Sequence, residues 1–286
     1  MSIQITEASG YDTKNMIFSE PVAGSIPNSS IQFKRIMIKT RYPDGKVGDL
    51  ILPTERLYSF GVNENVSPDT QKVTGYTMPM CMWSKDNCTP EEKTWTDTFE
   101  QIVEKCKDHL VEHKEDIEKW DLERIDLKRL NPLYWKKDKG VIVKGLGPKL
   151  YPKLIVSRKQ EKYNGIITYF YDQDDNRLDP EDLKGKPCFV RSAIKIESIF
   201  IGNKISLQVK LFECDVELIN KGGLTKLLRR PAQSSDVKEE VVNPMAEESD
   251  HEESDNDNND DEQEPVVEKP SPKTKKGKRG RGNTKK

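Results

Sequence analysis

The chain has 286 residues, of which 47 are lysine or arginine and 49 are aspartate or glutamate, and only 34% are hydrophobic. A typical globular domain has a larger hydrophobic share, so we expect a polar segment beside a smaller folded part. No apolar run approaches the roughly 18 residues of a transmembrane helix, and the first residues lack the apolar stretch of a secretion signal. Five cysteines at irregular spacing fit a reducing compartment better than a disulfide framework. The composition predicts a soluble, intracellular protein.

The polar segment is the C-terminal tail, residues 236–286, which holds 15 acidic, 10 basic and 7 hydrophobic residues and no aromatic residue. So little apolar surface cannot offset the entropy cost of ordering, and we therefore expect this tail to be disordered. Fifteen acids and one base fall within residues 236–268, whereas nine bases and no acid fall within residues 269–286. Residues 1–235 retain 37 basic and 34 acidic residues, a net charge near +3, and their length suits one domain.

The expected folded domain covers residues 31–230 and follows an irregular N-terminal arm over residues 1–30. Its first strand is indicated by residues 31–42, where side chains alternate in polarity with the two-residue period of a strand. A turn is expected at Tyr42-Pro43-Asp44-Gly45, because proline presets its own φ and glycine tolerates a positive one. Further short strands are predicted over residues 49–52, 57–62, 74–83, 150–156 and 165–171.

A helix is predicted to begin at Thr89-Pro90-Glu91-Glu92, because the threonine can cap the first turn, proline suits its first position and Glu92 completes a capping box. Apolar residues then recur at steps of three and four from Trp95 to Ile117. This spacing predicts an amphipathic helix of roughly seven turns that lies on a sheet. Residues 120–139 fit neither the helical nor the strand period, and the helical insertion is expected over about residues 90–135.

Two long strands end the expected domain, over residues 189–201 and 204–218, and Gly202-Asn203 joins them as a hairpin. The apolar phase changes after Leu211, which predicts a β-bulge or a sharp bend there. Many strands, one long helix and then more strands predict a mainly β fold, in the form of a Greek-key β-barrel with a helical insertion.

Common catalytic fingerprints are missing, since the sequence contains no G-x-x-x-x-G-K-[ST], no G-x-S-x-G and no H-E-x-x-H. The segment Asp172-Gln173-Asp174-Asp175-Asn176 begins like a calcium loop. However, Arg177 stands at the glycine position and Leu183 in place of the bidentate glutamate, so an acidic loop between strands is expected instead. We expect no enzymatic activity.

A zinc site is one interpretation of Cys106, His109 and His113, which share a helix face at i, i+3 and i+7, with Cys81 or Cys88 as a fourth ligand. The same face is the apolar stripe of the helix. Core packing is therefore the other interpretation, because free cysteine is among the most buried residue types. Core packing is preferred, and we expect no metal or other cofactor.

Cations and rings on the predicted strands point to single-stranded nucleic acid, whose binding needs positive charge along the backbone and exposed rings for the bases. We expect these side chains to line one groove. Scattered lysines on strand exteriors are also ordinary solvated surface, and burial in the core is an equal alternative for each ring. The candidate nucleic-acid-binding residues are Phe33, Arg35, Lys39, Arg41, Tyr58, Phe60, Lys153, Arg158, Tyr169, Tyr171, Arg191, Lys195, Lys204 and Lys210.

Several segments carry a resemblance to a known family: Leu57-Tyr58-Ser59-Phe60-Gly61-Val62, Met78-Pro79-Met80, Cys106-Lys107-Asp108-His109-Leu110, Lys149-Leu150-Tyr151, Tyr169-Phe170-Tyr171-Asp172 and the hairpin from Ile194 to Leu211. Over roughly residues 30–220 the chain resembles the OB-fold single-stranded DNA-binding proteins of nucleocytoplasmic large DNA viruses. These proteins are similar in turn to the replication single-strand binders of some bacteriophages. The shared motifs are packing and turn signatures of moderate specificity.

The resemblance implies an OB-fold-like barrel with the long helix between strands, and an acidic tail that competes with DNA and recruits replication proteins. Residues 239–264 match the acidic part of such a tail. The end of the chain departs from the pattern, because no aromatic residue follows Phe212 and residues 269–286 are basic. Lys273 to Arg281 is either an import or nucleic-acid patch, with Arg279-Gly280-Arg281-Gly282 as a short RG element, or a solubilising end.

Together these features predict a viral single-stranded DNA-binding protein that acts in DNA replication, recombination or repair by coating exposed strands without sequence preference. The expected partners are single-stranded DNA and, through the tail, replication proteins, and no membrane is expected. The expected location is the viral replication site in the cytoplasm or nucleus of the host. The alternative is a β-rich scaffold whose acidic tail binds basic partners, with no affinity for DNA strands in the folded domain.

Overall fold

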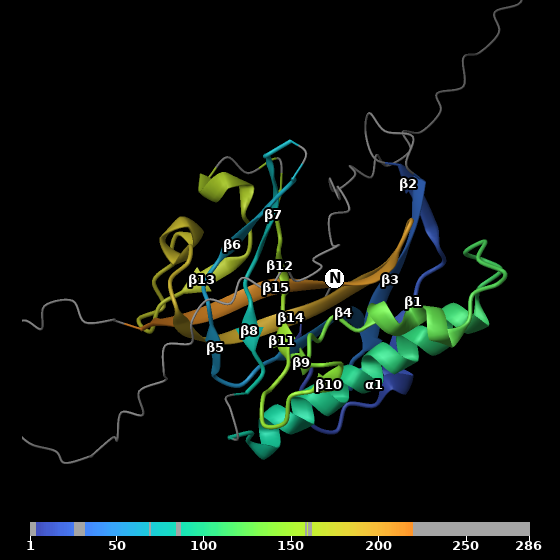
Figure 1. Cartoon of the computed structure of the whole chain (residues 1–286), viewed down its shortest axis with the longest axis horizontal. Helices are drawn as coiled ribbons and strands as arrows, with labels where there is room; N and C mark the ends of the chain where they lie inside the picture. Colours follow the sequence, from blue (N-terminus) through green and yellow to red (C-terminus); the bar gives the residue numbers. More distant parts are fainter. Residues whose placement is uncertain are drawn as a thin grey trace, which may run out of the picture.

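The computed structural model describes residues 4–25, 32–68, 70–83, 87–157, 159 and 162–219. The predicted C-terminal tail lies outside these residues. In the described part of the chain, a large curved sheet built around two long strands is packed against the helix α1 (Figure 1). The prediction of a mainly β fold with a helical insertion is confirmed.

Thirteen strands belong to the main sheet. They are β1 (Met16–Phe18), β2 (Val22–Ser25), β3 (Gln32–Arg41), β4 (Val47–Pro53), β5 (Leu57–Ser59), β6 (Asn63–Val66), β7 (Val73–Thr77), β8 (Met80–Cys81), β11 (Lys149–Leu150), β12 (Lys153–Leu154), β13 (Tyr169–Tyr171), β14 (Cys188–Ile201) and β15 (Ile205–Leu218). A separate small hairpin pairs β9 (Lys137–Asp138) with β10 (Val141–Ile142). The helical elements are α1 (Pro90–Glu112) and the 3-10 segments η1 (Thr13–Asn15), η2 (Arg124–Leu130), η3 (Lys162–Gly165) and η4 (Pro180–Leu183).

The hairpin of β14 and β15 is the axis of the sheet. One edge of β14 pairs in succession with β5, β4 and β3, and its other edge pairs with β15 along its whole length. The β14–β15 register shifts by one residue after the pair Ala193–Glu213, because Ile194 faces Leu211 and Phe212 is the extra residue. The predicted bulge near Leu211 is therefore confirmed, and it bends the hairpin at mid-length.

The far edge of β15 carries two short parallel partners, β12 and β13. The sheet order runs β1-β3-β4-β14-β15-β12-β7-β6, and the ladders β14–β5, β5–β8 and β8–β11 curl one end of it. Strands β1 and β6 stand at the two ends of this order, so the described strands do not form a closed barrel, and the prediction of a closed Greek-key barrel is wrong for them. Pro152 separates β11 from β12, and a proline has no N–H to donate to a ladder.

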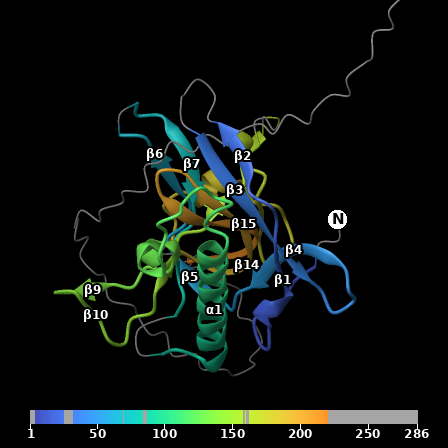
Figure 2. The ribbon, with the colours of Figure 1, turned by 90° about the vertical axis from the view of Figure 1, so that its right-hand side faces the viewer.

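Helix α1 begins as predicted. Thr89 Oγ1 accepts a hydrogen bond from Glu92 N at 3.2 Å and Glu92 Oε2 accepts one from Thr89 N at 2.9 Å, which completes the capping box. The apolar stripe packs into the core from Trp95 through Phe99 to Leu110, so the helix lies lengthwise under the sheet (Figure 2). The helix ends at Glu112, earlier than the spacing predicts.

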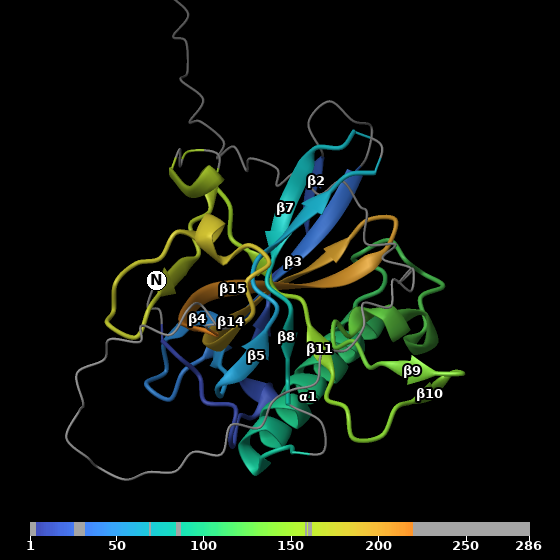
Figure 3. The same ribbon diagram turned by 60° about the vertical axis from the view of Figure 1, so that its left-hand side comes forward.

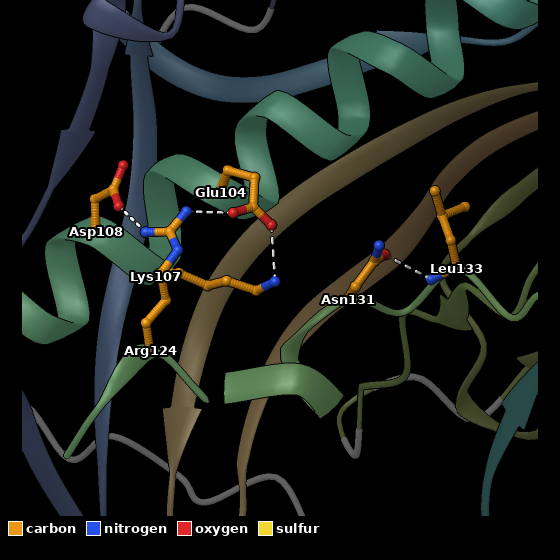
Figure 4. A network of polar contacts seen from close by, with 6 residues as sticks. All are labelled: Glu104, Lys107, Asp108, Arg124, Asn131 and Leu133. Atoms are coloured by element: carbon orange, nitrogen blue, oxygen red, sulfur yellow. Dashed lines mark hydrogen bonds and ion pairs between the residues drawn. The ribbon is translucent and has the colours of Figure 1, made fainter. Parts of the chain in front are cut away.

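The segment that follows α1 turns back and is tied to the helix by ion pairs. Arg124 bonds to the carboxylates of Asp108 and Glu104, and Lys107 Nζ lies 2.7 Å from Glu104 Oε1 (Figure 4). Asn131 Oδ1 then accepts a hydrogen bond from Leu133 N at 3.0 Å, which shapes the exit from η2. The ambiguous residues 120–139 thus form the 3-10 segment η2, which is tied to α1 through Arg124, then a loop, and the strand β9 of the small hairpin.

Residues 4–25, within the arm that the sequence predicts to be irregular, contribute β1 and β2 to the sheet. Both strands pair with β3, and the pairing supplies backbone hydrogen bonds that segments of three or four residues cannot reveal through polarity alone. The β2–β3 and β6–β7 pairs extend away from α1 (Figure 2 and Figure 3). In the sheet order, β4, β14, β15 and β12 lie between these two pairs.

Candidate nucleic-acid interface

Three lysines from neighbouring strands stand in one row across the centre of the sheet. Lys153 of β12 is the register partner of Lys210 of β15, and Lys210 is the register partner of Lys195 of β14. Register partners project from the same face of a sheet, with Cβ atoms roughly 5 Å apart. The row therefore gathers three positive charges on one face of the sheet.

Strands β4 and β3 extend the row. Asp49 of β4 faces Lys39 of β3 in the ladder, and its Oδ2 lies 2.8 Å from Lys195 Nζ. Arg35 and Arg41 occupy the same phase of β3 as Lys39, since side chains two residues apart share a face. We call this surface the basic face; it consists of Arg35, Lys39, Arg41, Lys153, Lys195 and Lys210, together with the carboxylate of Asp49.

The side chains at the centre of the basic face are mostly buried. Lys210 is only 6% exposed and its neighbour on the same phase, Gln208, 4%, although the sequence predicts Lys210 on an exposed outer phase. Lys210 lies on the predicted face of β15, but its side chain is more buried than predicted. The reason is that β15 is a central strand with partners on both edges of a curved sheet. Charges in such a partly desolvated site interact with an anion more strongly than charges in water.

Arg35 adds an unusual feature near the β2–β3 end of the basic face. Its Nε is buried and has no hydrogen-bond partner among the described residues. Its guanidinium carbon lies 5.9 Å from the centroid of the Phe33 ring. A buried donor without an acceptor is rare in folded proteins, and an anionic oxygen is the acceptor that a guanidinium prefers.

Phe33 belongs to the core and not to an accessible stacking surface. Its ring packs on Phe200, with centroids 5.0 Å apart and planes inclined by 27°, and it is 5% exposed. The ring also covers Gly24 of β2, where any added Cβ would collide with it. Phe33 is therefore buried by cross-strand packing, which is the alternative that the sequence leaves open for each ring.

Two accessible rings lie beside the basic face on β13. The rings of Tyr169 and Tyr171 are parallel within 5°, with centroids 6.3 Å apart, and Tyr169 is 41% exposed. Strands β12 and β13 follow the same edge of β15, where Lys153 pairs at Lys210 and Tyr169 pairs at Glu213. The structure therefore brings the predicted cations of the basic face and the two predicted tyrosines next to one another.

Other predicted residues lie outside the lysine row, although Arg191 shares the phase of Lys195 on β14. Tyr58 contacts Phe60 edge-on at 5.2 Å on the far side of β14, and the Phe60 ring lies under Lys149 Nζ at 4.9 Å. Arg191 is exposed and its Nη2 lies 3.4 Å from Glu55 Oε2. Lys204 is exposed just after the hairpin turn, and Arg158 lies outside the described residues.

The segment Lys149–Lys153 holds a feature that the site prediction misses. Lys149, Tyr151 and Lys153 alternate with the buried residues Leu150 and Pro152, and Tyr151 is 43% exposed. A ring between two cations suits a nucleic-acid strand. The alternation is visible in the sequence, but the proline within it hides the strand period.

The zinc interpretation finds no geometric basis in the described residues, where no group of three or more His, Cys, Asp or Glu side chains could hold a metal ion. Cys106 is fully buried in the core, and burial raises the pKa of its thiol. The His109 ring stacks on Phe18 with centroids 4.0 Å apart. Burial, followed by the neighbouring His113, lowers the pKa of His109 to about 4.

No helix among the described segments has the length and apolar character to span a membrane.

The chain belongs to a protein family of unknown function (DUF2738), whose model matches residues 9–259. It is 26% identical over 185 residues to the uncharacterized protein 007R of Invertebrate iridescent virus 3, a match that covers 64% of this chain and 38% of that protein. It is 27% identical over 238 residues to the early 31 kDa protein of Frog virus 3 (isolate Goorha), with 79% of this chain and 85% of that protein covered. The chain therefore spans well under half the length of the first relative.

Among solved structures, the chain is similar to gp2.5, a single-stranded DNA binding protein encoded by bacteriophage T7. The match covers 65% of this chain and 100% of that chain, with a TM-score of 0.34 and 14% sequence identity. A likeness at this level does not establish a common fold.

Proposed function

We propose that this member of a viral protein family binds single-stranded DNA on the basic face and its neighbouring tyrosines, without catalysis. The observation that carries the proposal is the row of Lys153, Lys210 and Lys195 on three adjacent strands, placed directly beside the parallel rings of Tyr169 and Tyr171. Binding of single strands without sequence preference combines this pairing of backbone cations with ring platforms.

Electrostatic and steric effects both favour the binding of a single strand to this surface. The positive charges of the lysine row attract the phosphates of an anionic chain, and their partial burial strengthens each contact with phosphate. Tyr169 is 41% exposed, and a base that stacks on its ring would contribute about 1 to 3 kcal/mol. A duplex presents its bases stacked inside, so the rings give single strands the advantage.

The finer parts of the proposal concern fold and biology. We propose that the curled end of the sheet, where the ladders of β14, β5 and β8 meet, corresponds to an OB-fold-like barrel arrangement. The role would be coating of exposed strands during viral DNA replication, recombination or repair. Coating needs no sequence preference, which agrees with a face that combines cations with rings.

The test is a fluorescence anisotropy titration of the full-length chain with single-stranded DNA, duplex DNA and RNA of one sequence, at about 50 and 200 mM salt. We expect the single-stranded DNA to bind tightest. Lys153→Ala with Arg41→Ala should weaken binding about tenfold and reduce the salt slope by roughly 0.7 per lost phosphate contact.

The matched control is Lys93→Ala with Lys186→Ala, which removes two exposed lysines outside the basic face. Equal losses from both double variants would mean that net charge alone drives binding. Absence of binding by the wild-type chain, or an equal affinity for duplex, would overturn the proposed function, and tighter binding of RNA would reassign the ligand.

A further inference from the structure

Arg177 lies in the segment that follows the turn after β13 and pairs back onto that strand. Tyr171 and Arg177 form an isolated antiparallel bridge, and Leu178 N donates a hydrogen bond to Phe170 O at 2.8 Å. Strand β13 thus has β15 along one edge and the segment of Arg177 along the other. Arg177 is exposed, and it was not among the residues that the sequence singles out for DNA binding.

The loop that presents Arg177 is the acidic segment that begins like a calcium loop, and its carboxylate at Asp172 is directed onto the loop itself. Asp172 Oδ1 accepts hydrogen bonds from Asn176 N at 2.8 Å and Asp174 N at 2.9 Å, and these bonds lower the pKa of Asp172. Asp175 takes the left-handed backbone conformation that closes the turn, with φ of 60°. The loop is therefore a defined turn, and its first carboxylate is engaged away from Arg177.

Two rings hold the Arg177 side chain instead of a carboxylate. Its guanidinium carbon lies 4.5 Å from the centroid of the Tyr169 ring and 4.9 Å from that of Tyr163. No hydrogen bond or ion pair joins this guanidinium to another residue within the described ranges. By contrast, Arg56 is ion-paired with Glu217 and Arg124 with Asp108. A guanidinium stacked on rings keeps its N–H edge available for a planar, bidentate anion.

Tyr163 reaches this position through an uncommon backbone conformation. Its φ is 55°, and the following Asn164 has φ of 52°, in the left-handed region that non-glycine residues rarely adopt. Residues held in such conformations concentrate at sites where a side chain must be aimed in a particular direction. Here the outcome is a second ring on the guanidinium.

The edge of β13 that pairs with β15 carries negative charge, which affects how a nucleic acid would lie on the tyrosines. Tyr169 and Tyr171 face Glu213 and Asp215 across the ladder with β15, and both carboxylates are exposed. Phosphates are repelled by these carboxylates and attracted to Arg177 on the other edge. Arg177 therefore offers a phosphate contact on the edge of β13 away from these carboxylates, in addition to the contacts of the lysine row.

We propose that Arg177, held between Tyr163 and Tyr169, binds a phosphate of the DNA strand and fixes the path of that strand across Tyr169 and Tyr171. The inference rests on the proposed function, because it names a further contact of the same ligand. Arg177 supplies the bidentate contact, and Tyr163 is a positioning residue that acts through Arg177.

The test measures single-stranded DNA binding of full-length variants by anisotropy across a salt series. Arg177→Ala should weaken binding about tenfold and reduce the salt slope by roughly 0.7. Arg177→Lys should keep the slope but lose about fivefold in affinity, because lysine retains the charge without the planar fork. Tyr163→Leu should weaken binding several-fold at an unchanged slope, whereas Tyr163→Phe, which keeps the ring, should bind like the wild type. Arg129→Ala, at an exposed position in η2, is the matched control.

The outcomes separate the two proposals. If the wild-type chain binds single-stranded DNA and Arg177→Ala binds equally well, this inference fails while the proposed function stands. If Arg177→Lys matches the wild type, a simple point charge suffices and the held fork is disproved. If the wild type does not bind, the proposed function itself fails. Circular dichroism melts identify a misfolded Tyr163→Leu protein, in which case the two Arg177 variants and Tyr163→Phe decide.

Discussion

Lys195 and Asp49 form an ion pair between β14 and β4, with 2.8 Å between Nζ and Oδ2 and side chains only 16% and 20% exposed. The pair places one carboxylate within the basic face. The Asp49 carboxylate therefore has two opposing effects. It reduces the repulsion between the lysines, and it competes with phosphate for Lys195.

Asp49→Asn should separate these two effects. Loss of the carboxylate leaves Lys195 without its partner in a mostly desolvated place, so we expect the free energy of unfolding to fall by about 1 to 3 kcal/mol. Affinity for single-stranded DNA should rise a few-fold, because the competing charge is gone. Urea unfolding and anisotropy measure the two quantities. Asp44→Asn, whose pair with Lys46 is far more exposed, is the control and should leave both nearly unchanged.

Phe33 and Tyr169 should respond in opposite ways to truncation. Phe33→Ala removes a buried ring that packs on Phe200, and we expect a loss of about 3 to 5 kcal/mol in unfolding free energy. Tyr169→Ala removes an exposed ring and should cost little stability, but about 1 to 3 kcal/mol in binding of single-stranded DNA. Thermal melts and titrations on both proteins check this. A Tyr169→Ala protein that binds normally would remove the ring from the interface.

Stability should depend on pH through His109. Burial and the neighbouring His113 lower the pKa of His109 to about 4, below the value near 6.5 of an unfolded histidine. Between these values the unfolded chain binds more protons, so this contribution to stability is complete above pH 6.5 and is lost as the pH falls toward 4. Since the ring is partly exposed, we expect about 1 to 2 kcal/mol.

Thermal unfolding at pH 4.5, 5.5 and 7.5 measures the effect. His109→Phe keeps the ring stacked on Phe18 and should flatten the pH dependence, whereas His113→Gln should retain most of it. An unchanged slope in His109→Phe would assign the acid sensitivity to other groups.

Helix α1 should depend measurably on its first cap. Thr89→Ala removes the acceptor for Glu92 N, and we expect a loss of about 1 kcal/mol in unfolding free energy. Thr94→Ala is the matched control, because Thr94 Oγ1 only donates back to Pro90 O within the helix and its removal should change stability little. Urea titrations of the two variants compare them; equal losses would show that the cap contributes nothing specific.

The parts of the fold that the sequence predicts correctly depend on local signals. The capping box at Thr89, the two long strands and the bulge at Phe212 each follow from residues close together in the chain. The end of α1 shows where such signals fail. Ile117 keeps the helical spacing and is buried, yet it packs from a turn beyond Glu112, because the core accepts an apolar side chain from any backbone that reaches it.

The candidate site also combines features that follow from the local sequence with features that do not. Strand phase places Lys39 with Arg35 and Arg41 on one face of β3, and Lys195 opposite the buried residues of β14, because phase is a local property. The burial of Lys210 and Phe33 depends on strands far away in the sequence, and no local pattern contains it. Arg177 gains its significance only from the Tyr163 ring, which a separate segment supplies.

The bulge at Phe212 has an effect on electrostatics as well as on shape. Glu213, Asp215 and Glu217 share a phase of β15 on one side of it, and Lys210 and Gln208 continue that same side of the sheet beyond it. With uninterrupted alternation Lys210 would face the core and Leu211 would face outward. The single extra residue therefore brings the Lys210 ammonium group to the same side of β15 as the carboxylates of Glu213 and Asp215.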